Sequence, residues 1–152
     1  MLEQWRHVHN VIVPPAALTL DEVRARAARY RLENAYADGV LVGCTTVRPP
    51  ARPDGGPDDA AVATVIAPDD AAVATVIARV LPPYRHQGLG TALYDRALAH
   101  ARALGAHEVE TCVLAANTDG LRFAHARGFA ETDRYVLDGE RDEWVDLRLT
   151  AR

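Results

Sequence analysis

The chain has 152 residues, 49% of them hydrophobic and 25% charged, which is an ordinary balance for a single domain that buries its own core. Its net charge of -4 and its lack of a basic stripe argue against a nucleic acid or an anionic membrane as partner. It has no apolar run of about 18 residues, and its first residues are too polar for a signal peptide. We therefore expect a cytoplasmic protein that acts on a small molecule.

Neither the cysteines nor the histidines form a pattern that binds a metal. Cys44 and Cys112 are far apart in the sequence and lack nearby ligands, so both are predicted to be free buried thiols. His7 and His9 are expected to lie on diverging faces of a helix and to be solvated. We expect no metal.

The N-terminal part of the chain predicts two helices. The first covers Leu2 to Val13, where hydrophobic residues recur every three or four positions until two prolines end the pattern. The second begins at Thr19, which forms a capping box with Glu22, and runs to about Tyr30.

A β-hairpin follows, and then a repeated segment. Arg31 to Tyr36 and Val40 to Val47 flank an Asp-Gly turn, which is a strong hairpin signal. Beyond a proline and glycine loop, Pro57 to Ala67 is repeated without change as Pro68 to Ala78. One exact copy is too short for a repeat fold. We expect the second copy to supply the central strand, from Val73 to Leu81, and the first copy to be an excursion.

The most informative stretch predicts a strand, a glycine turn and a long helix. Ala74 to Leu81 has the composition of a buried strand and ends at two prolines. The helix begins at Leu89 and ends at Gly105, with an apolar stripe at Leu89, Leu93, Ala97, Ala101 and Leu104. Its first turn has free N–H groups, and Gly88 and Gly90 leave them unshielded, so an anionic group such as a phosphate can bind there.

The C-terminal part predicts one more crossover and a closing hairpin. His107 to Leu114 reads as a strand parallel to the central one, because the helix between them forms a right-handed crossover. A shorter helix spans Thr118 to Arg127, and closing strands are predicted at Tyr135 to Leu137 and Trp144 to Leu149. Acidic residues cluster in this part; they are either an exposed loop or a mouth that attracts a cationic amine.

Two segments carry a family resemblance. The loop Arg85-His86-Gln87-Gly88-Leu89-Gly90 lacks the third glycine of a dinucleotide fingerprint and the lysine of a Walker loop. Together with the preceding Val80 to Tyr84, it resembles the acyl-CoA pyrophosphate loop of the GNAT-type N-acetyltransferase superfamily. The segment from Asn117 to Phe129 is similar to the family's second motif, N-x(6)-Y-x(3)-G-F.

The resemblance implies an α/β (α+β) domain covering residues 1–152. Its mixed, mostly antiparallel sheet would hold one parallel strand pair splayed around acyl-CoA, with helices on both faces. The implied reaction is direct transfer of acetyl from acetyl-CoA to a small-molecule amine in a ternary complex. The pantetheine arm would pair with the backbone of the central strand. The residues expected to bind the cofactor are Ala78, Arg79, Val80, Arg85, His86, Gln87, Gly88, Leu89, Gly90, Thr91 and Asn117.

Three points in this interpretation stay open. Asn117 is either a contact of the cofactor arm or simply the cap of the following helix. Ala124 stands where the family usually has the tyrosine that protonates the leaving thiolate, so the catalytic residues are unassigned. The family's first strand is absent before the first helix. Alternatives to an enzyme are therefore an acyl-CoA-binding or regulatory module, or half of a tandem or homodimeric assembly whose partner supplies an edge strand.

Overall fold

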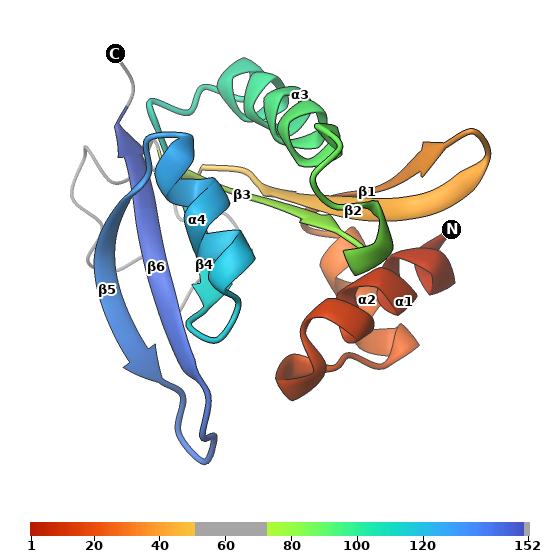
Figure 1. Cartoon of the computed structure of the whole chain (residues 1–152), viewed down its shortest axis with the longest axis horizontal. Helices are drawn as coiled ribbons and strands as arrows, with labels where there is room; N and C mark the ends of the chain where they lie inside the picture. Colours follow the sequence, from red (N-terminus) through yellow and green to blue (C-terminus); the bar gives the residue numbers. More distant parts are fainter. Residues whose placement is uncertain (51–72, 151–152) are drawn as a thin grey trace.

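The computed structural model describes residues 1–50 and 73–150, whose helices and strands follow the predicted order (Figure 1). The N-terminal half holds α1 (Leu2–Ile12), the short 3-10 helix η1 (Pro14–Ala16), α2 (Leu20–Ala27), β1 (Arg31–Ala37) and β2 (Val40–Arg48). The C-terminal half holds β3 (Val73–Val80), η3 (Pro82–Tyr84), α3 (Leu89–Ala103), β4 (Glu108–Leu114), α4 (Thr118–Ala126), β5 (Ala130–Val136) and β6 (Glu143–Thr150).

The strands of the described residues form one sheet in the order β1-β2-β3-β4-β6-β5. All neighbouring strands are antiparallel except β3 and β4, which are parallel. The predicted mixed sheet with a single parallel pair is therefore confirmed. The second copy of the repeated segment supplies β3 from Val73 onward, while the first copy, Pro57 to Ala67, lies outside the described residues.

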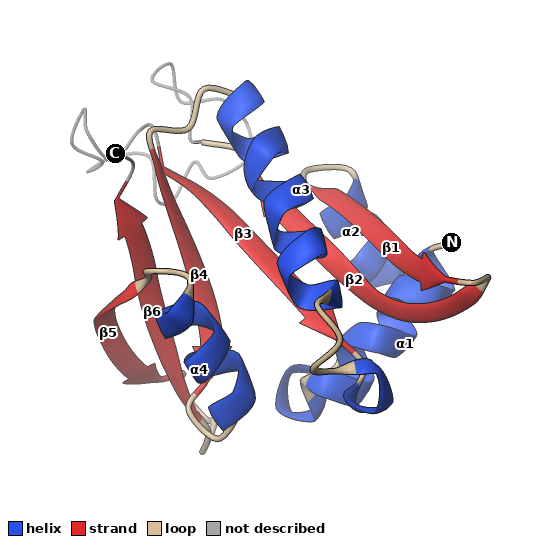
Figure 2. Cartoon of the chain, turned by 45° about the horizontal axis from the view of Figure 1, so that its top comes forward, coloured by secondary structure: helices blue, strands red, loops and turns tan. Residues whose placement is uncertain are grey.

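The two parallel strands stay together over only three residue pairs, from Val73 and Glu108 to Thr75 and Glu110. Beyond that point β3 continues to Val80 along β2, and β4 continues to Leu114 along β6. The strands consequently diverge toward their C-terminal ends, as Figure 2 shows. Among the described residues, this divergence leaves one edge of β3 without a neighbouring strand.

Helices cover both faces of the sheet, as expected. In Figure 2, α3 and α4 lie in front of it and α1 and α2 lie behind it. Because side chains alternate across a strand, β3 contributes to both layers. Ala74 and Val76 pack into the core with α3 and α4, whereas Leu81 packs into the second core with α1 and α2.

The buried face of α3 differs from the predicted stripe. The buried residues are Tyr94, Ala97, Leu98 and Ala101, and Leu104 is 46% exposed. A step of four residues turns a helix by about 40° more than a full turn. Three such steps therefore rotate the predicted stripe from the half-buried Leu89 to the buried Ala101, so that only Ala97 and Ala101 of the stripe lie on the buried face.

Two local motifs of the N-terminal half are confirmed. The Thr19 hydroxyl accepts the Glu22 backbone N–H at 3.2 Å, and the Glu22 carboxylate accepts the Thr19 N–H at 3.0 Å, which completes the capping box. Asp38 and Gly39, with φ of 51° and 79°, both adopt the left-handed conformation that a tight hairpin turn between β1 and β2 requires.

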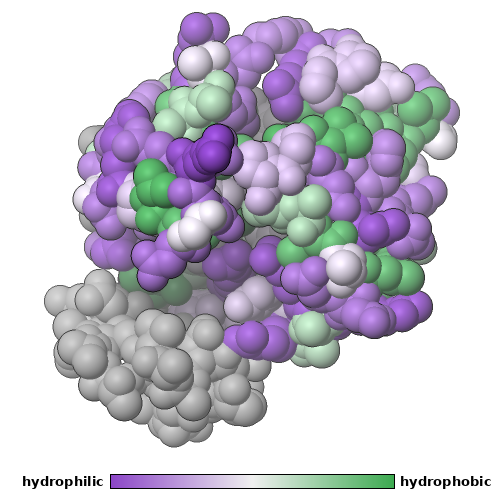
Figure 3. Space-filling model, turned by 90° about the horizontal axis from the view of Figure 1, so that it is seen from below, coloured by the Kyte–Doolittle hydropathy of each residue, from purple (hydrophilic) through white to green (hydrophobic). Residues whose placement is uncertain are grey.

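The surface seen from below in Figure 3 is hydrophilic over most of its area, and its apolar atoms form separate small patches. Scattered patches of this kind are normal on a protein surface. Within residues 1–50 and 73–150, the helices are too short or too polar to cross a membrane.

The predicted solvation of His9 is wrong. Its side chain is 3% exposed, because it follows Trp5 by one helical turn and therefore lies on the same buried face of α1. The two rings stack with their centroids 5.3 Å apart. Burial, with a smaller effect from the positive charge of Arg79, lowers the pKa of His9 from 6.5 to about 4.

This buried histidine predicts a loss of stability in mild acid. The unfolded chain binds a proton at His9 below pH 6.5, whereas the folded protein does not until about pH 4. The free energy of unfolding is therefore unaffected by this group above pH 6.5. It decreases as the pH falls toward 4, by up to about 3 kcal/mol. We expect urea unfolding to show this loss in the wild type and a smaller loss in His9→Gln. The matched control His7→Gln changes an exposed residue of the same helix and should keep the wild-type slope.

Candidate functional site

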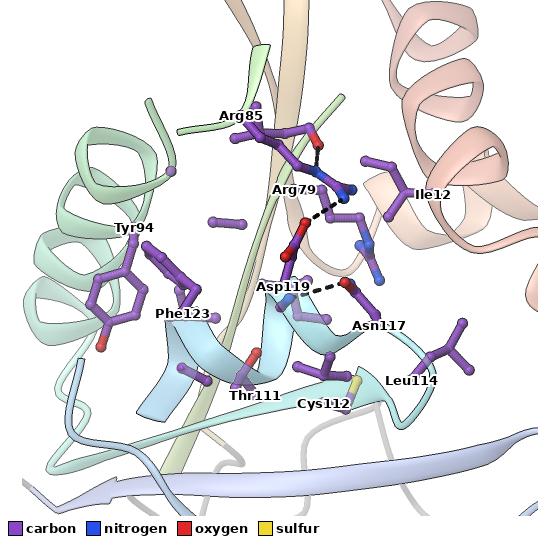
Figure 4. Close-up of a pocket in the computed structure, with 18 of the residues that line it drawn as sticks. Ile12, Arg79, Arg85, Tyr94, Thr111, Cys112, Leu114, Asn117, Asp119 and Phe123 are labelled. Atoms are coloured by element: carbon purple, nitrogen blue, oxygen red, sulfur yellow. Dashed lines mark hydrogen bonds and ion pairs between the residues drawn. The ribbon is translucent and has the colours of Figure 1, made fainter. Parts of the chain in front are cut away.

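A cavity of about 290 Å³ opens between the diverging strands β3 and β4 (Figure 4). The end of α1, the loop before α3, and helices α3 and α4 complete its walls. Its lining includes Ile12, Val13, Val76, Ile77, Ala78, Arg79, Val80, Arg85, His86, Gly88, Gly90, Thr91, Tyr94, Thr111, Cys112, Val113, Leu114, Asn117, Asp119, Gly120, Phe123, Ala124, Phe129 and Trp144. Of the residues predicted to bind the cofactor, the exposed Gln87 and the half-buried Leu89 are absent from this lining.

The free edge of β3 presents peptide groups to this cavity. The Leu81 N–H donates to the Val42 carbonyl at 2.8 Å, and antiparallel pairing alternates from one residue to the next. The backbone groups of Ala78 and Val80 must therefore point away from β2, toward the diverging β4. The Val80 carbonyl accepts the Arg85 Nε–H at 2.9 Å, so Ala78 keeps both its N–H and its C=O directed into the cavity.

The loop between η3 and α3 turns through two left-handed residues, His86 with φ of 63° and Gly88 with φ of 80°. Gly88 caps α3, and its carbonyl accepts the first helical N–H, from Ala92, at 3.2 Å. The preceding N–H groups of the first turn have no partner within the helix. An atom added at Gly90 would lie 3.5 Å from the Phe123 ring and 3.8 Å from Val80, which places this glycine against the cavity wall.

The positive charge of this loop is partly balanced by Asp119. Its carboxylate lies 3.7 Å from the Arg85 guanidinium, 4.0 Å from His86 Nε2 and 3.9 Å from the Arg122 guanidinium. Asp119 was not among the site residues predicted from the sequence. Because the parallel crossover brings the start of α4 beside the start of α3, its place early in the second motif was the available signal.

Asn117 caps α4, which was one of the two roles left open for it. Its Oδ1 accepts the Gly120 N–H at 3.0 Å, and the same side chain lines the cavity. The cap is tight, since an atom added at Gly120 would lie 2.6 Å from Asn117 Nδ2.

Tyr94 is a further lining residue that sequence reasoning missed. Its ring meets Phe123 and Phe129 edge-on and lies 4.8 Å from the Arg127 guanidinium. The hydroxyl is buried without a hydrogen-bond partner among the described residues, and burial raises its pKa. In Figure 4 it points away from Arg79 and Asn117.

The two cysteines differ in their surroundings. Both thiols are free, but Cys44 is buried beneath α1, whereas Cys112 is half-buried and lines the cavity. Burial raises the pKa of both thiols, that of Cys44 to about 11. Among the residues that the structure describes, no group of three histidines, cysteines or carboxylates is placed to hold a metal ion.

Several solved structures share this fold. A putative phosphinothricin N-acetyltransferase is 18% identical, with a TM-score of 0.74 over 99% of this chain and 92% of that one. The putative acetyltransferase yncA from Salmonella typhimurium, determined with its cofactor acetyl-CoA, is 19% identical, with a TM-score of 0.67 over 99% and 87%. The ribosomal-protein-S18-alanine N-acetyltransferase from Escherichia coli is 17% identical, with a TM-score of 0.68 over 98% and 86%.

The sequence itself has no match among curated proteins. Residues 2–129 match the family model described as the acetyltransferase (GNAT) family, and this range includes both segments that suggested the resemblance. Since the match covers most of the chain, and the sheet with its diverging parallel pair agrees with the solved structures, this protein belongs to the GNAT family of acetyltransferases.

Proposed function

We propose that this protein is an N-acetyltransferase that transfers the acetyl group of acetyl-CoA directly to a small-molecule amine. The observation that carries the proposal is the continuity of one cavity, in which the open peptide edge at Ala78 runs into the free N–H groups of the α3 first turn. The first feature suits an amide-rich arm and the second suits a phosphate. Acetyl-CoA contains both, in that order.

The pantetheine arm of acetyl-CoA would add to β3 as a short strand, pairing with Ala78 and with the Val80 N–H. The pyrophosphate would then lie at the loop, against the N–H groups that follow Gly88. Arg85 is already fixed there by its hydrogen bond to the Val80 carbonyl. A phosphate would compete with Asp119 for the remaining donors of Arg85, and a helix N-terminus favours the anion further.

The reaction joins an amine nitrogen to the thioester carbonyl carbon. The tetrahedral intermediate collapses by breaking the carbon–sulfur bond, the sulfur takes up a proton as CoA thiol, and the nitrogen loses a proton. A backbone N–H of the β3 edge is placed to stabilise the oxyanion. The carboxylate among the described lining residues, Asp119, faces the arginines of the loop. We therefore propose that the amine loses its proton to water.

The direct test is to follow CoA thiol release from acetyl-CoA with and without a panel of amines, and to detect the acetylated amine by mass spectrometry. Amine-dependent release with matching product supports the enzyme. Binding of acetyl-CoA without any release would instead support the alternative, a non-catalytic acyl-CoA-binding module.

The first prediction concerns the loop. Acetyl-CoA at a hundredfold excess over its dissociation constant should stabilise the protein by about 2.7 kcal/mol, which raises the melting temperature. Gly88→Ala strains a residue with φ of 80° and misaligns the first-turn N–H groups, so this rise should be lost. Gly39→Ala is the matched control, because Gly39 has φ of 79° and equally open surroundings but lies in the β1–β2 hairpin. An unchanged rise in Gly88→Ala would refute the loop assignment.

The second prediction concerns the missing tyrosine. If only the proton donor for the thiolate is lacking, Ala124→Tyr should raise the turnover number by about 10² or more, with little change in the affinity for acetyl-CoA. Ala124 lines the cavity but is only 3% exposed, so the larger side chain must find room there. The measurement is steady-state thiol release, with the melting temperature as a check on folding. Unchanged turnover in a folded variant would mean that water already serves as the donor.

A further inference from the structure

Three arginines face one another on the side of the sheet that α1 and α2 cover. Arg48 and Arg79 belong to neighbouring strands. Arg48 pairs with Thr75 and Cys44 pairs with Arg79, so alternation along β2 and β3 puts both arginine side chains on the same face. Arg26 reaches them from α2. Burial lowers the pKa of Arg26, and the positive charges of Arg48 and Arg79 lower it further, as expected if the three side chains face one another.

We call Arg26, Arg48 and Arg79 the arginine cluster. They lack the carboxylate partners that most other arginines of the described chain have. Arg24, Arg31, Arg96, Arg127 and Arg134 all form ion pairs, whereas no described carboxylate is within ion-pair distance of a cluster arginine. The Arg48 Nε–H is buried and has no hydrogen-bond partner within the part of the chain that the structure describes. Its guanidinium lies over the Tyr30 ring at 5.1 Å, which attracts the charge but does not neutralise it.

The groups around the arginine cluster do not supply the missing charge. Arg79 lies beside the thiols of Cys44 and Cys112, and the raised pKa of each keeps it neutral near pH 7. Two carboxylates are within electrostatic reach of the cluster, Glu22 of Arg26 and Asp146 of Arg48, but neither is in an ion pair with these arginines. Glu22 closes its capping box, and Asp146 accepts the Tyr135 hydroxyl at 2.9 Å.

The three arginines are partly buried, and like charges that are partly withdrawn from water without an ion-pair partner cost free energy. A guanidinium has a donor geometry that matches carboxylate and phosphate oxygens. The position of the arginine cluster shows what an anion there would belong to. Arg79 lines the cavity, on the side of Ile12 in Figure 4, and its strand neighbours Ala78 and Val80 form the edge assigned to the cofactor arm. Arg79 is the member of the arginine cluster that lines the cavity, so an acceptor in the cavity would reach the cluster through Arg79.

We propose that the acceptor is a small amine that also carries an anionic group, a carboxylate or a phosphonate, and that Arg26, Arg48 and Arg79 bind this group. The inference rests on the proposed function, because it assigns the acceptor of the same cavity. Such a molecule is a zwitterion, and its positively charged amine would face the cavity wall opposite Arg79. Cys112 lines the cavity from β4, and its register partner on β6 is Asp146, so a carboxylate lies next to the wall opposite Arg79.

The test compares acceptors that differ only in their charge. We expect alanine or 2-aminoethylphosphonate to give a kcat/KM at least tenfold above that of alaninamide or ethylamine. Arg26→Gln and Arg48→Gln should each raise KM for the anionic amines about tenfold or more, which is typical of a lost charged hydrogen bond, and leave the neutral amines little changed. Arg24→Gln is the matched control, because Arg24 is exposed on the same helix as Arg26 and pairs with Asp21 at 3.1 Å.

A binding measurement keeps this inference separate from the proposed function. With CoA at saturation, N-acetylalanine should raise the melting temperature and N-acetylalaninamide should not, and Arg48→Gln should abolish the difference. If amines are acetylated regardless of an anionic group and the two probes act alike, the anion site is refuted while the transferase stands. If the acid probe alone binds but no amine is acetylated, the transferase fails and the anion site stands.

Discussion

The separation of β3 from β4 is the constraint on which the rest of this structure depends. A strand inside a sheet normally has hydrogen-bonding neighbours on both sides, and an unpaired buried peptide group costs free energy. Here the pairing ends after Thr75 and Glu110, although both strands continue. An open edge of this kind is tolerable where water or a ligand supplies the partners. The opening has walls on both faces of the sheet, because residues of α1 on one face and of α3 and α4 on the other line the same cavity.

The two faces of the sheet differ in their chemistry at this opening. The front face of the sheet brings together the starts of α3 and α4, so backbone N–H groups and Arg85 converge there with the compensating carboxylate of Asp119. The back face holds the arginine cluster, which has no such compensation among the described residues. The cavity thus connects a loop whose positive charge Asp119 partly balances to a group of arginines, reached through Arg79, that no described carboxylate pairs with.

The sequence predicted the features that depend on neighbouring residues. The strand, glycine turn and helix around Gly88 are local, as are the capping box at Thr19 and the Asp-Gly hairpin, so composition and spacing were sufficient to find them. The predicted buried face of α3 was wrong because apolar residues at intervals of four look like one straight stripe in the sequence. On the helix itself, successive steps of four residues turn gradually around the axis.

The parts that could not be predicted depend on tertiary packing. His9 is buried because α1 presents one face to the sheet, which spacing alone does not fix. Asp119 meets Arg85 through the crossover, and Arg26 meets Arg48 and Arg79 through the docking of α2. Like-charged residues that face one another have no signature in a single sequence. The arginine cluster was for this reason hidden among the seventeen arginines of the chain.

The identity of Arg79 has a chemical consequence for an enzyme of this kind. A lysine buried at the same point would have its pKa lowered by the low-dielectric surroundings and by the positive charge of Arg48. It would present a neutral primary amine beside the thioester, and the protein would become its own acceptor. A guanidinium remains protonated under the same burial and is not a nucleophile. The chain contains no lysine at any position, so its side chains offer no primary amine that could be modified in place of the substrate.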